Sequence, residues 1–131
     1  MTPETLVGLA VDAMQGAYAP YSGYQVGAAL LCADGTVYTG FNIENASYTP
    51  TVCAERTAFF KAITDGKRDF SAIAVCGGKD GVIEGYFPPC GVCRQVMREF
   101  CKDDFLIHMA GADGAIKTRT LAQLLPESFS L

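Results

Sequence analysis

Three cysteines and one glutamate stand out because their types and spacing could do chemistry. Cys53 and Glu55 lie two positions apart, and Cys90 and Cys93 form a Cys-x-x-Cys pair further along the chain. Such a pair at a helix start lets two sulfurs point to one side of the first turn, and a third cysteine from another helix start supplies a third corner of a tetrahedron. The pattern therefore predicts one Zn²⁺ per chain, held by Cys53, Cys90 and Cys93.

The fourth corner of this predicted zinc site has no candidate ligand in the sequence. A structural zinc site closes with a fourth Cys or His, whereas a catalytic site leaves that position to water. Glu55 follows Cys53 by two residues, so on the first helical turn its carboxylate can lie beside the open position without binding the metal. Zinc lowers the pKa of such a water to roughly 7, and a nearby carboxylate can take its proton and return it later. Glu55 is thus the candidate catalytic proton carrier of a hydrolytic reaction.

Charge neutralisation is the next requirement of such a site. Three thiolates around Zn²⁺ sum to one negative charge, which weakens the ability of the metal to acidify water. Placing the cysteines at helix N-termini brings partial positive charge and free N–H donors near the sulfurs. Arg56 follows directly on Glu55, and we expect its guanidinium to hydrogen-bond to a thiolate and tune the charge from outside the ligand set.

Two other interpretations of the cysteines compete with catalytic zinc. A redox Cys-x-x-Cys pair would leave Cys53 and Glu55 unexplained, and no βαβ pattern leads into it. A structural zinc would need a fourth ligand, yet His108, the only histidine, lies mid-strand and is expected to be a packed or edge residue. The other cysteines end apolar segments and are interpreted as buried free thiols: Cys32, Cys76 and Cys101.

The elements that must position these residues alternate along the chain. Helices are expected from residue 2 to before Pro20, over 51–65, over 90–100, and from a Thr120 cap to Pro126. Strands are expected where apolar runs lie between turn signals: 24–32, 37–42, 70–76, 105–110 and 116–118. This order predicts an α/β fold in which a mixed five-stranded sheet is covered by helices on both faces, a three-layer αβα sandwich. We expect one domain over residues 1–131.

Composition restricts the partners and the compartment. The net charge is −4 and no run of Lys or Arg occurs, which argues against a nucleic-acid partner held by phosphate contacts. Charged residues make up 18% of the chain and hydrophobic residues 50%, and charged residues make up about 25% of average soluble proteins. This apolar excess indicates an oligomer. The sequence has neither an export signal nor an apolar run of membrane-spanning length, so a cytoplasmic protein without a membrane partner is predicted.

Several blocks of sequence closely resemble the small, homotetrameric cytidine deaminase family that acts on free nucleosides. They cover most of the chain and include the zinc motifs: Ala19-Pro20-Tyr21-Ser22, Gln25-Val26-Gly27-Ala28-Ala29-Leu30, Asn42-Ile43-Glu44-Asn45-Ala46-Ser47-Tyr48, Cys53-Ala54-Glu55-Arg56-Thr57-Ala58, Pro89-Cys90-Gly91-Val92-Cys93-Arg94-Gln95, and Leu124-Leu125-Pro126 followed by Phe129. The resemblance implies a cytidine deaminase-like fold, zinc on the three cysteines and Glu55 as proton shuttle.

The resemblance also assigns substrate contacts. Asn42 and Glu44 match the ligands of the ribose 3′-hydroxyl, and Ala54 matches a residue that lines the substrate site. Tyr24 occupies the place of an aromatic that packs on the pyrimidine. Two further matches, Tyr48 and Phe129, correspond to aromatic residues that reach the pocket of a neighbouring subunit. They imply a homotetramer with shared active sites. The stretch 77–87 is longer than in many relatives.

The function that these residues imply is zinc-dependent hydrolytic deamination of cytidine and deoxycytidine, which releases ammonia in pyrimidine salvage. A related zinc deaminase for another aminopyrimidine nucleoside is the alternative, and assays on several substrates separate the two. A nucleic-acid editing protein on the same fold should carry a basic channel, which the acidic charge opposes. A non-catalytic zinc scaffold would bind zinc fully and release no ammonia.

Overall fold

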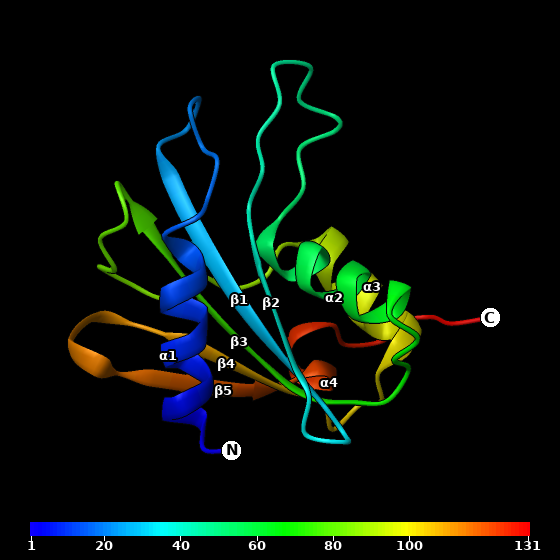
Figure 1. Ribbon diagram of the computed structural model, residues 1–131. Helices are drawn as coiled ribbons and strands as arrows, with labels where there is room; N and C mark the ends of the chain where they lie inside the picture. The colour runs from blue at the N-terminus through cyan, green and yellow to red at the C-terminus, as the bar shows by residue number, and fades with distance from the viewer.

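The computed structural model describes residues 1–131 and has a central sheet between two layers of helices. Figure 1 shows α1 against one face of the sheet and α2 and α3 on the other. The bounds of the elements are α1 Pro3–Met14, β1 Tyr24–Cys32, β2 Val37–Phe41, α2 Ala54–Thr64, β3 Phe70–Lys79, α3 Gly91–Phe100, β4 Leu106–Ala110, β5 Ile116–Thr120 and α4 Leu121–Leu124, with a short 3-10 turn at Ala112–Gly114. The predicted three-layer α/β architecture is confirmed.

The sheet is mixed, in the order β2-β1-β3-β4-β5. Only β3 and β4 run parallel; the other neighbours are antiparallel. Successive side chains of a strand point to opposite faces, which divides the core in two. On β1, Ala28 and Leu30 pack with α2 and α3, whereas Ala29 packs against α1. The layer of α2 and α3 holds the larger cluster, and the candidate site lies on this side.

Glycine at position 40 lets α2 approach the sheet closely. A Cβ atom built on Gly40 would lie 2.5 Å from the carbonyl oxygen of Ala54 and 2.6 Å from the amide nitrogen of Ala58. Real Cβ atoms do not approach backbone atoms so closely, so only glycine fits here. The contact sets the depth at which the first turn of α2, and with it Cys53, lies against β2.

Several element boundaries differ from the sequence-based expectation, and two of these differences have a clear physical reason. The first helix ends at Met14, well before Pro20, because the chain beyond it is drawn onto the sheet: Tyr18 pairs with Ile43 in a bridge, and Gly16 abuts the ring of Phe41. Strand β3 continues past residue 76 to Lys79, since its pairing with β1 extends to Tyr24.

The single histidine and three of the cysteines are core residues, as the sequence predicted. His108 is 5% exposed, and its Nδ1 lies 2.7 Å from the hydroxyl of Thr118 on the neighbouring strand. Burial lowers the pKa of His108. The remaining free thiols outside the site are all buried: Cys32, Cys76 and Cys101. None of the helices combines the length and apolar character needed to cross a membrane.

Candidate active site

Two helix starts bring the three predicted metal cysteines together. Cys53 is the N-cap residue of α2, and Cys90 is the N-cap residue of α3. The backbone N–H of Cys93 donates to Cys90 Sγ at 3.5 Å, which holds the Cys90 side chain at the first turn of α3. The three Sγ atoms all lie within 4.8 Å of one another, and the Sγ atoms of Cys53 and Cys90 are 3.8 Å apart.

This arrangement fits zinc. A tetrahedral site with the usual zinc–sulfur length of about 2.3 Å has corners about 3.8 Å apart, which matches the separation of Cys53 and Cys90. No fourth Cys, His, Asp or Glu belongs to the cluster, so the three sulfurs form an open set, as in catalytic sites. No disulfide joins any of the cysteines.

The electrostatics of the cluster favour a thiolate at Cys53. Cys53 accepts hydrogen bonds from the Cys93 thiol and from Arg56, which lower its pKa to about 5, with the Cys93 contact the stronger cause. The contact with Cys53, together with burial, raises the pKa of Cys93. Arg56 donates from Nη2 to Cys53 Sγ at 3.3 Å, whereas its buried Nε has no protein partner. The predicted contact between Arg56 and a thiolate is therefore present.

Glu55 lies at the start of α2 and is 4% exposed, although it carries a titratable carboxyl group. Burial is the largest influence on this group, and it raises the pKa of Glu55 to about 7. A carboxyl with a pKa near neutrality can both accept and donate a proton at physiological pH. Glu55 lines the same cleft as Cys53 and Cys90.

The cysteines and Glu55 open into a cleft of about 410 Å³, within the ordinary range for small-molecule sites. Its wall is formed by residues from β1, β3, the start of α2 and the loops that precede β1, α2 and α3. Most of the predicted site residues occur in it. Ser22 and Val26, which belong to the sequence blocks that resemble the family, also line the wall. The wall further contains residues to which the sequence analysis gave no role: Thr51, Val52, Val75, Phe87 and Pro88.

Asn42 and Glu44 lie on this cleft wall and are already fixed by other groups. The Asn42 side chain accepts from the N–H of Val26 at 2.9 Å and donates to the carbonyl of Tyr24 at 2.8 Å. Glu44 accepts from two backbone N–H groups, both at 3.0 Å, and from the Ser22 hydroxyl. The Ser22 contact lowers the pKa of Glu44. Both side chains keep unused hydrogen-bonding positions, so they form a preorganised polar patch.

Two aromatic rings form the other notable part of the wall. Tyr24, the predicted stacking residue, has its ring centroid 5.9 Å from that of Phe87. Lys79 places its Nζ 5.7 Å from the Tyr24 ring centroid. Phe87 lies over Gly77, where a Cβ atom would come within 2.9 Å of the ring. Sequence analysis missed Phe87, although an aromatic residue immediately before Pro-Pro-Cys was a signal that it borders the metal loop.

The last three predicted substrate residues differ in their placement. Ala54 is fully buried and lines the cleft. Tyr48 is 78% exposed and Phe129 is 68% exposed, and neither lines the cleft of its own chain. The tertiary structure of one chain therefore does not bring these two aromatic side chains to the site.

Comparison with known proteins agrees with this geometry. Residues 1–109 match the family model described as the cytidine and deoxycytidylate deaminase zinc-binding region. A cytidine deaminase of Sporosarcina psychrophila is 48% identical over 130 residues, covering 99% of this chain and 93% of the relative. One of Halalkalibacterium halodurans is 49% identical over 130 residues, covering 99% and 96%.

A solved structure is similar over the whole fold. The crystal structure of cytidine deaminase from Burkholderia pseudomallei has a TM-score of 0.91 and 44% identity, with 98% of this chain and 100% of that chain covered. The matched zinc-binding region and the fitting Cys53, Cys90 and Cys93 cluster agree on zinc as the cofactor. The chain is a member of the zinc-dependent cytidine deaminase family.

Proposed function

We propose that this chain hydrolyses the exocyclic amino group of free cytidine and deoxycytidine, giving the uracil nucleoside and ammonia. The observation that carries the proposal is that one cleft contains the cysteine cluster, the buried Glu55 and the polar patch of Asn42 and Glu44. The first two groups suit hydrolysis at a ring carbon, and the third suits a sugar hydroxyl. The named relatives are cytidine deaminases.

In the proposed mechanism, Cys53, Cys90 and Cys93 hold the zinc ion. When bound, zinc supplies Lewis acidity that makes a water molecule more acidic. Glu55 takes a proton from the attacking water and delivers it to the ring nitrogen next to the reacting carbon. It then carries a second proton to the departing amino group, which leaves as ammonia while the carbonyl forms. A carboxyl with a pKa near 7 suits both directions of transfer.

Asn42 and Glu44 are proposed to bind the ribose 3′-hydroxyl. The lowered pKa of Glu44 keeps its carboxylate charged, so this group accepts a hydrogen bond from the 3′-hydroxyl. Asn42 donates its second amide N–H to the hydroxyl oxygen. A site built to pair with a hydroxyl strongly rejects a substrate that lacks it, because its polar groups are left unpaired. Tyr24 is proposed to pack on the pyrimidine, with Ala54 beside it.

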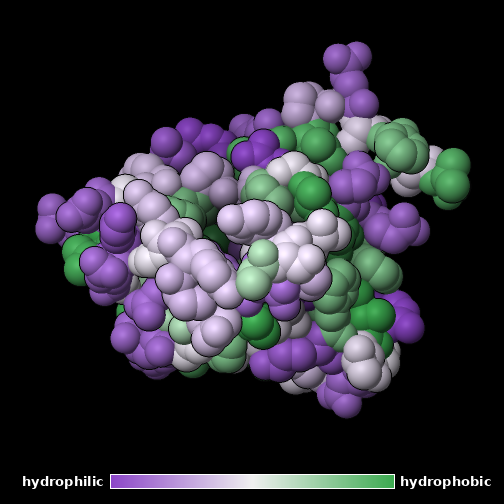
Figure 2. Space-filling view, turned by 90° about the horizontal axis from the view of Figure 1, so that it is seen from above, coloured by the Kyte–Doolittle hydropathy of each residue, from purple (hydrophilic) through white to green (hydrophobic).

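We also propose a homotetramer whose sites borrow Phe129 and Tyr48 from neighbouring subunits. Both aromatics are largely exposed and away from the cleft of their own chain. Figure 2 shows hydrophobic residues gathered toward the side of α2, α3 and the C-terminal tail, and Phe60 and Val92 there are 47% and 58% exposed. Burial of such a surface between subunits favours assembly.

The remaining parts of the proposal concern the chain as a whole. We infer one domain over residues 1–131, because a single sheet receives strands from residue 24 to residue 120 and both helical layers pack on it. We infer a reducing compartment, the cytoplasm, because the metal set needs free thiols and all six cysteines are unpaired.

The decisive test is a substrate panel on zinc-loaded protein, with ammonia and product both measured. Cytidine and deoxycytidine should be converted, 3′-deoxycytidine should be a poor substrate, and cytidine monophosphate should not compete. Preference for an aminopyrimidine antibiotic over cytidine would support the related zinc deaminase instead. Full zinc loading without ammonia release from any member of the panel would show a non-catalytic zinc protein.

A further inference from the structure

Residues 83–89 lead directly into the metal cysteines, and they make almost no polar contacts of their own. Phe87 and Pro88 from this segment line the cleft, and Cys90 follows it. No residue of 83–89 takes part in a backbone–backbone hydrogen bond, and Pro88 and Pro89 have no backbone N–H with which to donate one. Besides ring contacts such as that of Phe87 with Gly77, any hydrogen bond that fixes this wall must therefore come from a side chain elsewhere.

Arg94, in the first turns of α3, makes the only hydrogen bond that residues 83–89 receive. Its Nε donates to the carbonyl oxygen of Pro89 at 2.7 Å, and its Nη1 donates to the carbonyl oxygen of Leu124 at 2.6 Å. Pro89 is buried, so removing this donor would leave its carbonyl without a partner, which destabilises that position. The second bond anchors the guanidinium on the end of α4.

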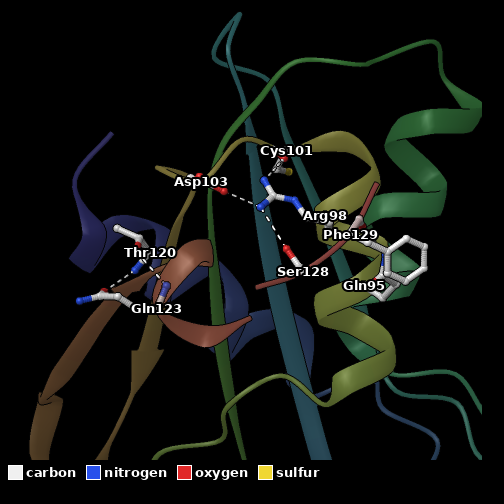
Figure 3. A network of polar contacts seen from close by, with 8 residues as sticks. All are labelled: Gln95, Arg98, Cys101, Asp103, Thr120, Gln123, Ser128 and Phe129. Atoms are coloured by element: carbon white, nitrogen blue, oxygen red, sulfur yellow. Dashed lines mark hydrogen bonds and ion pairs between the residues drawn. The ribbon is translucent and has the colours of Figure 1, made fainter. Parts of the chain in front are cut away.

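Helix α3 also holds the C-terminal tail, which keeps this second anchor in place. Gln95 Nε2 donates to the carbonyl oxygen of Phe129, and Arg98 Nη1 donates to the hydroxyl of Ser128, both at 3.4 Å. Arg98 also pairs with Asp103. Figure 3 shows these side chains reaching from α3 to the tail. Helix α3, which begins at the metal cysteines, is thus fixed by further polar contacts from Gln95 and Arg98.

We propose that Arg94 is a positioning residue that sets where Cys90 and the wall formed by Phe87 and Pro88 lie. It lies outside the metal cluster and the lining of the cleft, and it acts through the carbonyl of Pro89, one residue before Cys90. The proposal rests on the proposed function for the roles of the cysteines and the cleft. Without the guanidinium, residues 83–89 lose their one hydrogen bond next to Cys90, so Cys90 binds zinc less firmly and the substrate wall shifts.

The test compares Arg94→Gln and Arg94→Lys with the wild type. Arg68→Gln is the matched control, because Arg68 is exposed and also donates to backbone carbonyls, those of Ile63 and Lys67. The readouts are the rate of zinc release to a chromogenic chelator, the absorption spectrum of Co²⁺-substituted protein, the melting temperature, and kcat and KM for cytidine. These readouts separate zinc binding, global stability and substrate binding.

Arg94→Gln should release zinc about 10-fold faster than the wild type, as is typical when a group that orients a metal ligand is lost. Its Co²⁺ spectrum should shift, and its KM should rise more than its kcat falls. Arg94→Lys should lie between, because one ammonium can replace one of the two contacts at a time. Arg68→Gln should release zinc at the wild-type rate.

A folded Arg94→Gln protein with wild-type zinc release and Co²⁺ spectrum would overturn the proposal, even if its melting temperature fell, because that result describes a merely structural arginine. If Arg94→Gln does not fold, Arg94→Lys decides by the same readouts: faster zinc release supports the proposal and an unchanged rate overturns it. Absence of deaminase activity in the wild type would refute the proposed function and leave the zinc-release comparison valid.

Discussion

At the scale of single residues, the unusual property of the site is a nearly buried carboxyl group beside three sulfurs. Glu55 is held in place by the first turn of α2, and its burial brings the pKa close to neutrality. In the proposed mechanism, the cost of desolvating this carboxylate prepares the group for proton transfer. Arg56, its neighbour in sequence, contacts Cys53 instead.

The proton-carrier role of Glu55 makes a first prediction. Glu55→Gln removes the titratable group and keeps the size, so zinc content should stay at one per chain while kcat falls by about 10²–10⁴-fold, as is typical for loss of a general acid-base residue. Metal analysis and steady-state kinetics on the same preparation measure both. Asp12→Asn, an exposed change on α1 on the other face of the sheet, serves as the control and should be neutral. Near-normal turnover of zinc-loaded Glu55→Gln would remove Glu55 from the mechanism.

Arg56 makes a second prediction, because its contact with Cys53 offsets thiolate charge. Arg56→Gln should lower kcat by roughly 10–100-fold, the usual range for groups that support a metal ligand, while zinc content falls much less. Arg56→Lys restores the charge without the planar donor geometry and should recover part of the rate. Equal rates for Arg56→Gln and the wild type would contradict the electrostatic role.

His108 makes a third prediction, which concerns stability. Burial lowers its pKa in the folded chain, whereas an unfolded histidine has a pKa of about 6.5. Below that pH the unfolded chain binds a proton that the folded chain refuses, so the free energy of unfolding falls as the pH drops from about 7 toward the lowered pKa. This contribution is fully present above a pH of about 7.

The measurement is denaturant unfolding from about pH 8 to about pH 5 for the wild type and for His108→Gln, with the same zinc loading. Because acid also weakens thiolate ligation in both proteins, the difference between their pH profiles isolates the histidine. The wild type should lose more stability than the variant across this range. Parallel profiles would show that His108 does not contribute to the pH dependence.

At the scale of secondary-structure elements, the site depends on where two helices begin. Cys53 and Cys90 are both N-cap residues, so the positive ends of the two helix dipoles face the thiolates. The depth of α2 against the sheet is set by its contact with Gly40, and the entry to α3 is held by Arg94. Two contacts outside the metal cluster therefore set where the two helix starts lie.

Gly40→Ala tests the contact between α2 and β2. The added methyl group would collide with backbone atoms of Ala54 and Ala58, and such overpacking costs about 1–3 kcal/mol of unfolding free energy. Gly8→Ala is the matched control: a Cβ there meets nothing within 4 Å inside α1, and this change should stabilise the chain by about 0.5–1 kcal/mol. Denaturant unfolding measures both. A Gly40→Ala variant as stable as the wild type would show that α2 shifts at no cost.

At the scale of the whole molecule, one chain presents an open cleft and an exposed aromatic tail that does not reach it. Phe129 is 68% exposed, and its carbonyl oxygen accepts a hydrogen bond from Gln95 of α3. Transfer of such an exposed ring from water into an apolar pocket is favourable in free energy. This arrangement is the structural reason for proposing shared sites.

Phe129→Ala tests the shared pocket. Stacking of an aromatic ring on a base contributes roughly 1–3 kcal/mol, so KM should rise by about 5- to 150-fold while zinc content is unchanged. Phe129→Tyr keeps the aromatic face and should stay close to the wild type. Light scattering at the assay concentration should give the mass of a tetramer. A fully active monomer, or an unaltered KM in Phe129→Ala, would show that the pocket is built within one chain.

The sequence by itself determined the chemistry and the order of the elements. Cysteine spacing, the missing fourth ligand and the position of Glu55 depend on local helix geometry, so the positions of Cys53, Cys90 and Cys93 along the chain suffice to group them. The alternation of apolar runs and turn signals predicted the five strands and the two helical layers, which the structure and the comparison with solved structures confirm.

The tertiary structure decided what depends on contacts between distant parts of the chain. Helix α1 ends at Met14 because the residues after it contact the end of β2. The burial that raises the pKa of Glu55 results from packing of α2 on the sheet. Phe87 enters the cleft because Gly77 leaves room for its ring, and Arg94 joins Pro89 to Leu124. Apart from the position of Phe87 beside Pro-Pro-Cys, local pattern carries little signal for these contacts, because most of the residues involved meet only when the sheet is complete.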